Sequence, residues 1–375
     1  MIENAISYNL KRLRIARHLS KKKISEDAGL SRVAYSNIEN GKAEPRVSNL
    51  QRIGNVLGVG IQELVTPAPN ISSLRFRSLK TLSSVEVSKR KQIVGDVANW
   101  LKDFNEIEGM LDNKIAYSFK TPYHKESEPR KVAKEIRGRL DLAPAEVIND
   151  ICGLLESAGI KIYPVGSDLS KFFGLSVAEP DGGPAIGINT SDNISIERQI
   201  FTVAHELGHL LLHKDSYNAS GLKEDKRQEN EADEFASYFL MPQEAFDKKW
   251  KENRGKHWLD GVLHIKRIFK VSFGTVLNRL IEVGVTDNSI WRKFYWTYEQ
   301  KFGKKLTDHK EPEGLDGSGK EPIGLVEADF TEDRLSCLVR EALEKELISF
   351  SRAAEILKIS IEKMRERTNS WKLLK

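Results

Sequence analysis

Apolar residues at helical spacing predict a run of helices at the amino terminus. They recur every three or four positions on the first helix, at Ile6, Leu10, Leu13 and Ala16. Ser20 then stands where an N-cap would begin a short second helix, and Gly29 suits a left-handed turn after it. Ser31 would cap a third helix, on which Tyr35 falls on the inner, apolar face. The pattern predicts a helix-turn-helix with Tyr35 in its core.

The middle of the chain changes from helical to strand-like patterns and back. Residues 66–70 indicate a linker, and 85–112 then carry apolar positions at helical spacing. Three short apolar runs predict strands, at 160–165, 175–178 and 185–189. Another helix is expected to begin near Ser195. We expect the strands to form a small antiparallel sheet beside that helix.

The last third of the chain is predicted to be helical, with one interruption. A pair of helices is expected over 262–284, with Val271-Ser-Phe as the turn between them. Residues 303–322 hold mainly Gly, Pro, Lys, Asp and Glu, with almost nothing to bury, and predict a flexible linker. Helical spacing returns over 329–374, where 348–360 resembles another helix-turn-helix. We interpret this tail as interaction or dimerisation helices.

Length and composition agree with a protein of several domains. A chain of 375 residues exceeds what one hydrophobic core usually organises and allows two or three domains. Its net charge of +5, with both signs spread throughout, does not by itself indicate a nucleic-acid partner. The two cysteines, Cys152 and Cys337, give no disulfide framework, which fits a reducing cytoplasm. We expect neither a signal peptide nor a membrane-spanning segment, because the first helix is charged and no apolar stretch is long enough.

The candidate chemistry lies in residues 201–213, which contain the motif H-E-x-x-H. Residues four apart on a helix project from the same face, so His205 and His209 can direct both imidazoles at one metal ion. Glu206 lies beside them, where it can act on water rather than bind the metal. Zinc also needs a third protein ligand, and a catalytic site keeps its fourth position open.

Spacing narrows the choice of the third ligand. Where a metzincin has glycine and histidine, this chain has Leu212 and Asp215, so that arrangement is excluded. His213 lies one turn further along the same helix, too far to join easily, and we expect it to line the pocket or to contact a ligand. A second predicted helix follows, and Glu229 and Asp233 share one face of it.

The stretch F-T-V-A-H-E-L-G-H-L-L-L-H, followed by E-N-E-A-D-E-F-A-S-Y-F-L-M-P, resembles the ImmA/IrrE family of metallo-endopeptidases, and its order of residues is similar to gluzincin peptidases. The resemblance implies that His205, His209 and Glu229 bind zinc and that Glu206 is the general base. Asp233 stands where the family more often has asparagine. The resemblance implies that it orients a ligand imidazole.

The sequence leaves two features of this site undecided, the third ligand and the group that stabilises an oxyanion. Glu231 is a rival to Glu229 as third ligand, although it points away from the face that carries Asp233. The group that would stabilise an oxyanion is not visible in the sequence, and Tyr238 and His213 are the candidates.

A second resemblance covers roughly residues 5–65. The run L-R-x-A-R-x-x-S, with A-G-L-S-R and I-E-N-G-K after it, resembles the XRE family of lambda-type repressor domains. Arg14 and Glu39 resemble the internal salt bridge of that family. The chain departs from the family at Lys21, where glutamine is common, so the operator contact at this position does not carry over.

The resemblance also suggests which residues would meet DNA. With the third helix in the major groove, Arg32, Val33 and Asn37 face outward near its start, and Lys21 stands at the head of the preceding helix. Arg32 could pair with guanine, Asn37 with adenine, and Val33 could contact a thymine methyl group. Phosphate contacts are expected from six other basic residues: Lys11, Arg12, Lys22, Lys23, Lys42 and Arg46.

The sequence therefore predicts a mostly helical α+β protein with a small sheet in a zincin-like domain. Five regions are expected: 1–66, an XRE-type DNA-binding domain; 67–118, a linker and helical spacer; 119–300, a zinc metallopeptidase domain; 301–325, a flexible linker; and 326–375, a helical C-terminal region.

Together the two resemblances imply a cytoplasmic transcription regulator of a stress response. It would bind a double-stranded DNA operator, as a homodimer, and use zinc or manganese to cleave a protein substrate, which would be a helix-turn-helix repressor or the chain itself within 66–70. An edge strand of the sheet could hold that substrate in extended form. The alternative is a DNA-binding repressor or antitoxin-type regulator whose metal domain is a non-catalytic sensor.

Overall fold

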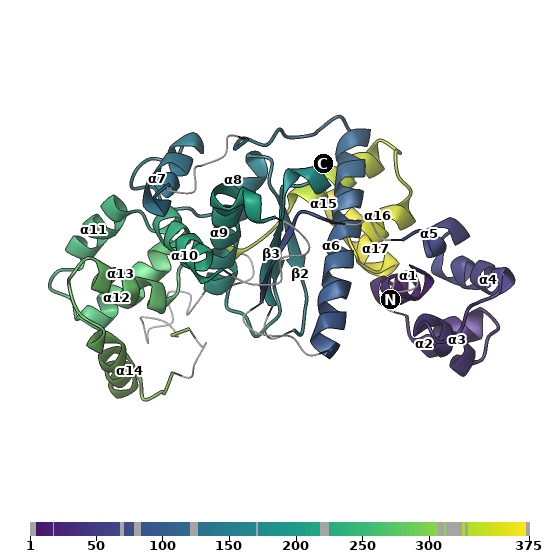
Figure 1. The fold of residues 1–375 in the computed structure, drawn as a ribbon, viewed down its shortest axis with the longest axis horizontal. Helices are drawn as coiled ribbons and strands as arrows, with labels where there is room; N and C mark the ends of the chain where they lie inside the picture. Colours follow the sequence, from purple (N-terminus) through teal and green to yellow (C-terminus); the bar gives the residue numbers. More distant parts are fainter. Residues whose placement is uncertain are drawn as a thin grey trace. The chain divides into compact units, whose positions relative to one another are not determined.

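In the computed structural model the chain forms two compact units, each assembled from separate stretches of sequence. Unit 1 comprises Met1–Ile71, Leu82–Lys114 and Asp333–Lys375, and unit 2 comprises Ser72–Thr81 and Ile115–Glu332. The residues that the structure describes are 5–17, 19–67, 71–78, 84–120, 127–169, 172–217, 225–306, 311–312, 325–326 and 329–372. Seventeen α-helices and one four-stranded sheet lie within them (Figure 1). The predicted fold class, mostly helical α+β with a small sheet, is confirmed.

The amino-terminal part of unit 1 is a bundle of five short helices. They are α1 (Ala5–Ala16), α2 (Lys21–Asp27), α3 (Arg32–Glu39), α4 (Val47–Leu57) and α5 (Ile61–Val65). Ser20 and Ser31 cap α2 and α3, because each side chain accepts a hydrogen bond from a backbone N–H three residues later. Gly29 has a φ of +65°, which lets the chain turn between these helices. Tyr35 is fully buried, as predicted.

The rest of unit 1 consists of a long helix and the C-terminal helices. These are α6 (Ser84–Met110), α15 (Arg334–Glu344), α16 (Phe350–Ile356) and α17 (Ile361–Lys372). Arg334 pairs with Glu108 of α6 at 2.8 Å, and Arg352 pairs with Asp103 at 2.6 Å, so ion pairs tie the tail to α6. The predicted linker over 303–322 falls outside the described residues except for 303–306 and 311–312.

The sheet of unit 2 is mixed, which corrects the expectation of an antiparallel sheet. Its strands are β1 (Leu74–Ser78), β2 (Lys161–Val165), β3 (Phe172–Val177) and β4 (Ala185–Asn189), in the order β1-β3-β4-β2. The pairs β1–β3 and β3–β4 are antiparallel, whereas β2–β4 is parallel. The reason is topological. β3 and β4 pair with opposite directions, and β2 pairs with the other edge of β4 and runs in the same direction as β4.

Strand β1 is a second difference from expectation, because the sequence placed residues 67–118 in a linker and spacer. Leu74 and Phe76 are buried on one face of the strand, and Arg75 between them points the other way. Phe76 stacks on Phe172 of β3, with ring centroids 5.0 Å apart. The segment just before the spacer helix is thus an edge strand of the sheet in unit 2.

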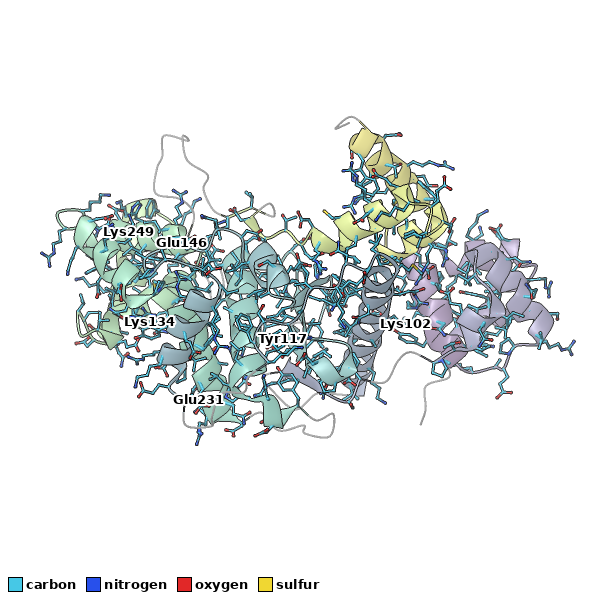
Figure 2. All side chains as sticks on the ribbon, turned by 90° about the horizontal axis from the view of Figure 1, so that it is seen from above. Lys102, Tyr117, Lys134, Glu146, Glu231 and Lys249 are labelled. Atoms are coloured by element: carbon cyan, nitrogen blue, oxygen red, sulfur yellow. The ribbon has the colours of Figure 1, made fainter. Side chains whose placement is uncertain are left out.

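Helices make up most of unit 2. They are α7 (Pro129–Arg139), α8 (Ile151–Ser157), α9 (Ile196–Leu212), α10 (Lys226–Leu240), α11 (Gln243–Glu252), α12 (Trp258–Phe269), α13 (Phe273–Glu282) and α14 (Ser289–Phe302), with short 3-10 turns η1 (Glu179–Asp181) and η2 (Lys214–Ser216). Two of these helices, α8 and α9, pack against the strands of the sheet. Helices α12 and α13 are the predicted pair. Charged side chains such as those of Lys134 and Glu146 are exposed (Figure 2).

Helix α9 is held between β3 and β4 of the sheet and helix α10. Gly208 allows α10 to approach closely, because a Cβ atom at that position would lie 3.0 Å from the ring of Phe235. The two helices that carry the candidate metal ligands are therefore packed against each other.

Candidate metal centre

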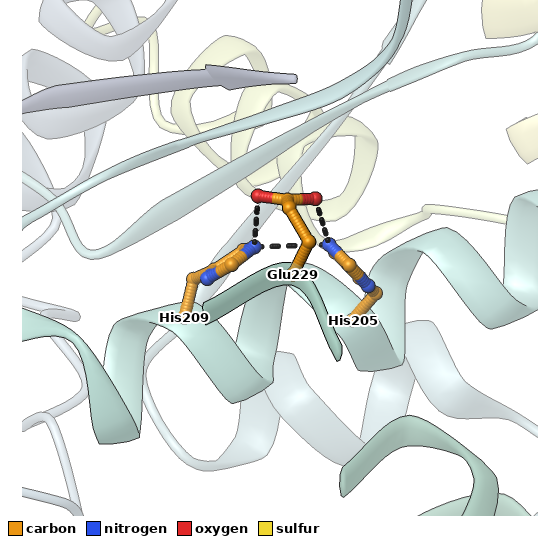
Figure 3. A group of neighbouring side chains, drawn as sticks. All are labelled: His205, His209 and Glu229. Atoms are coloured by element: carbon orange, nitrogen blue, oxygen red, sulfur yellow. Dashed lines mark hydrogen bonds and ion pairs between the residues drawn. The ribbon is translucent and has the colours of Figure 1, made fainter. Parts of the chain in front are cut away.

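Three side chains from α9 and α10 converge inside unit 2. His205 and His209 are completely buried, and their Nε2 atoms lie 2.9 Å apart. The carboxylate of Glu229 faces both rings, with Oε2 3.3 Å from Nε2 of His205 and Oε1 3.3 Å from Nε2 of His209 (Figure 3). Within the described residues this is the one group of three or more potential ligands close enough to hold a metal ion.

The donor set and its spacing fit zinc. Ligand atoms about 2.0–2.1 Å from a tetrahedral zinc ion stand about 3.3 Å from one another, close to the separations in this cluster. Burial lowers the pKa of His209, which favours the neutral imidazole that a metal requires. Burial alone would raise the pKa of Glu229, but its contacts with His205 and His209 outweigh burial and lower the pKa well below its usual range.

The other ring nitrogen of each histidine is also held by a side chain. Nδ1 of His205 lies 2.7 Å from Oδ1 of Asp233, and Nδ1 of His209 lies 2.8 Å from Nδ1 of His213. Nε2 of His213 in turn lies 2.9 Å from Glu231. One arrangement of protons satisfies all three contacts: both ligand imidazoles donate from Nδ1, and His213 donates from Nε2.

That arrangement separates the two rival glutamates. Glu231 contacts His213 and Arg227, the latter at 2.8 Å, whereas Glu229 faces the two central rings. The structure therefore brings Glu229 together with the histidines and places Glu231 outside the cluster.

Four candidate DNA-contact residues lie at the surface of the amino-terminal bundle. Arg32 and Val33 are exposed at the start of α3, with Val33 70% exposed, and Asn37 is half-buried one turn later. Lys21 has an internal partner, because its Nζ lies 3.0 Å from Oε1 of Glu39.

The predicted internal salt bridge of this bundle is confirmed. Nε of Arg14 lies 2.7 Å from the buried carboxylate of Glu39. Lys21 pairs with the same carboxylate, so its ammonium group also contributes to the internal contacts of the bundle.

Comparison with family models identifies both regions. Residues 10–64 match the model described as "Helix-turn-helix", and residues 155–281 match the M78 peptidase model described as "IrrE N-terminal-like domain". The chain carries both domains. The two family resemblances seen in the sequence are thereby confirmed.

Comparisons with whole proteins add little to this assignment. No curated protein matches the chain. Among solved structures, the crystal structure of ComR from Streptococcus suis matches 98% of this chain and 96% of its own, with 12% identity and a TM-score of 0.16. No helix of the described residues is long and apolar enough to cross a membrane.

Inside the IrrE-like domain, Glu206 is held by residues that the sequence did not single out. The hydroxyl of Ser176, on β3, donates to Oε2 of Glu206 at 2.6 Å, and the hydroxyl of Tyr217 lies 2.7 Å from Oγ of Ser176. Burial raises the pKa of Tyr217 well above its usual value, so the phenol keeps its proton and can donate to Ser176. No motif spacing indicates these two residues, because β3 and the segment after η2 meet only in the folded domain.

Tyr238, a candidate for oxyanion stabilisation, is engaged elsewhere. The guanidinium of Arg279 lies 3.8 Å from the centre of its ring, and that of Arg130 lies 4.7 Å from it. Tyr217, linked to Glu206 through Ser176, is the tyrosine that belongs to the network of the metal centre.

A residue of β1 also reaches the metal centre. Nη2 of Arg75 lies 2.8 Å from Oε1 of Glu229, and its Nη1 lies 2.7 Å from Oε1 of Gln228. The side chain is mostly buried, with 13% of its surface exposed. Arg75 therefore adds a fixed positive charge beside the carboxylate that faces both histidines.

Proposed function

We propose that this protein is a DNA-binding transcription regulator whose IrrE-like domain is a zinc-dependent endopeptidase. The observation that supports the enzymatic half is the convergence of His205, His209 and Glu229 on one point, with Glu206 buried beside them. Three protein ligands leave a fourth position open, which is the arrangement of catalytic rather than structural zinc sites.

The residues divide the chemistry between them. His205, His209 and Glu229 would hold the ion, which when bound supplies Lewis-acid activation of a water molecule and a peptide carbonyl. Glu206 would accept a proton from the attacking water and return it to the leaving amine. Ser176 orients the Glu206 carboxylate by donating to Oε2. Asp233 and His213 would hold the two ligand imidazoles in their productive tautomers.

The helix-turn-helix domain would direct this activity to particular genes. Helix α3 presents Arg32, Val33 and Asn37 for the major groove, and we assign direct base contacts to these three. We assign Lys21 a supporting contact, because Glu39 already engages it. Operators read by such domains have two-fold symmetry, so the proposal includes a homodimer.

The proposed substrate is a protein, and a helix-turn-helix repressor is the candidate that fits a peptidase fused to an operator-binding domain. The chain itself is another, cleaved within residues 66–70, of which 68–70 lie outside the described residues. We place this activity in the cytoplasm, as part of a stress response, with manganese as the alternative metal.

The test compares new protein amino termini in host cells that carry the wild-type chain or Glu206→Gln, with and without DNA-damaging stress. One or a few cleavages present only with the wild type would identify a specific peptidase and its substrate. Identical amino termini under conditions where the wild type still regulates its operator would rule out the peptidase.

One observation favours a second function, a regulator that binds metal without hydrolysis. Arg75 contacts the Glu229 carboxylate, so an arginine already lies against the site that a substrate would have to approach. Regulation that survives Glu206→Gln but is lost with His205→Ala would favour this sensor. Loss of regulation with both variants would favour the peptidase.

A further inference from the structure

Strand β3 lies directly on the helix that carries Glu206. Gly174 of β3 has no room for a side chain, because a Cβ atom there would lie 2.6 Å from Thr202 and 3.4 Å from Cγ of Glu206. Two residues further along the strand, Ser176 donates to Glu206. One edge of β3 pairs with β4, and the other edge is the side on which an extended peptide could add as a strand next to the metal centre.

In this structure that edge is occupied by the chain itself. β1 runs antiparallel to β3, with Leu74 opposite Val177, Arg75 opposite Ser176, and Phe76 opposite Leu175. Its residues come from a stretch that is far from the rest of the domain in sequence, since unit 2 resumes only at Ile115. β1 thus uses the backbone groups that an added peptide strand would need.

The side chains of β1 match the two faces of this edge. Leu74 and Phe76 are each 9% exposed, and Phe76 stacks on Phe172. Arg75 alternates with them and bonds to the carboxylate of Glu229. An apolar–arginine–apolar sequence therefore fits the edge, because the carboxylate of Glu229 holds the arginine and the core accommodates the two apolar side chains.

Asp181, in the turn η1 after β3, holds the residues that immediately precede β1. Its carboxylate accepts hydrogen bonds from the backbone N–H groups of Ser72 and Ser73 and from both serine hydroxyls. Burial alone would raise the pKa of Asp181, but these hydrogen bonds outweigh it and lower the pKa below its usual value. One side chain thus makes four of the contacts that hold the segment in place.

We propose that β1 is an intramolecular inhibitory strand, which occupies the site where the IrrE-like domain takes an extended peptide. The ligand class is a peptide in β conformation with an arginine between two apolar residues, as in Leu74-Arg-Phe76. Its entry displaces β1 and removes Arg75 from Glu229. The role of this peptide as a substrate rests on the proposed peptidase function, whereas its binding does not.

The experiment uses the full chain with Cys337→Ser and Glu206→Gln, loaded with zinc, and a fluorescent peptide of sequence Ile-Ser-Ser-Leu-Arg-Phe-Arg-Ser. Asp181→Asn weakens the hydrogen bonds to Ser72 and Ser73, because an amide is uncharged and keeps only one oxygen acceptor. Arg75→Gln removes the ion pair with Glu229 and leaves the hydrogen bonds of Asp181 unchanged. Asp192→Asn, an exposed aspartate in the loop after β4, is the matched control. Leu74→Cys with Val177→Cys, at paired positions, would lock β1 in place when oxidised.

We expect Asp181→Asn and Arg75→Gln each to bind the peptide on the order of tenfold more tightly than the parent chain, because a larger fraction has an open edge. The control should bind like the parent. Oxidation of the cysteine pair in the Asp181→Asn chain should abolish binding, and reduction should restore it. A peptide with alanine in place of its first arginine should bind more weakly.

The result that would overturn the proposal is equally specific. If neither Asp181→Asn nor Arg75→Gln binds the peptide more tightly than the parent, β1 is a permanent strand of the domain. The same conclusion follows if both variants only lower the melting temperature. Separately, cleavage of the peptide is measured in chains that retain Glu206. Tighter binding without Glu206-dependent cleavage would support the inhibitory strand and contradict the peptidase function. Glu206-dependent cleavage without tighter binding would support the peptidase function and contradict the inhibitory strand.

Discussion

The candidate metal centre and the proposed DNA-contact surface differ in how their side chains are held. His205, Glu206 and His209 are fully buried, and side chains of neighbouring residues fix each of them. Arg32 and Val33 of α3 are exposed, and their partner would be a molecule outside the chain. The folded chain alone therefore sets the geometry of the metal centre, whereas a bound duplex would set that of the DNA surface.

This difference predicts different responses to mutation. A buried cluster whose members hold one another should fail as a unit when one member is removed. Exposed residues that act one by one on a ligand should give graded and roughly additive losses. The predictions below test this contrast, beginning with the largest effect.

Removal of a ligand side chain should abolish metal binding. We expect His205→Ala and Glu229→Ala each to lose stoichiometric zinc, because either change leaves two ligands where a catalytic site needs three. Metal analysis of the purified chains by mass spectrometry measures this. His264→Ala, a histidine of α12 outside the cluster, is the control and should keep its metal. Full zinc occupancy in Glu229→Ala would show that another residue completes the site.

Loss of Asp233 should weaken metal binding without abolishing it. Asp233→Ala removes the acceptor that orients the His205 ring, and we expect about 10–100-fold lower zinc affinity. Competition with a chelator of known affinity measures the change. Asp233→Asn keeps an oxygen acceptor at the same position and should retain most of the affinity. Equal losses in both variants would mean that the charge, rather than the hydrogen bond, is what matters.

A DNA-contact residue should give a smaller, sequence-specific loss. Arg32→Ala should cost about 1–3 kcal/mol of binding free energy on the specific operator and little on random duplex. Titration of both duplexes at fixed salt measures it. Lys42→Ala, at an expected phosphate contact, should weaken binding to both duplexes alike. If Arg32→Ala behaves like Lys42→Ala, Arg32 is not a base reader.

A half-buried carboxylate in the helix-turn-helix domain, that of Glu63, should give the smallest effect. Burial and the neighbouring Glu355 of α16 raise the pKa of Glu63 to about 7. This folded-state pKa lies above the unfolded value of about 4.3. Glu63 therefore makes its full contribution to folding stability below about pH 4.3, and this contribution is lost as the pH rises through 7. Glu63→Gln should therefore remove the decline in stability between pH 6 and pH 8.

Urea unfolding of the full chain at both pH values measures this effect. The control is Glu44→Gln, at an exposed position, which should keep the pH dependence of the wild type. An unchanged pH dependence in Glu63→Gln would assign the decline to another group.

The sequence by itself determined the local parts of this protein. Helical spacing sets His205 and His209 four residues apart on one face, and the geometry of a helix alone brings their rings together. Ser20, Ser31 and Ser195 mark helix starts, also through a local contact, because each side chain accepts a hydrogen bond from the backbone N–H three residues later. The resemblance to known motifs supplied the Arg14–Glu39 pair, which no local rule indicates.

Only the tertiary structure decided which distant residues complete the metal centre. Arg75 lies 154 residues before Glu229, and Ser176 lies 30 residues before Glu206. Pairing of β1 with β3 brings in Arg75, and packing of β3 on α9 brings in Ser176. Both depend on which elements become neighbours in the fold, a choice that periodicity along the chain does not encode. For the same reason the sequence predicted an antiparallel sheet and left β1 out of it. Helices are fixed by contacts within a few residues, whereas the edge that β1 covers exists only once the sheet has formed.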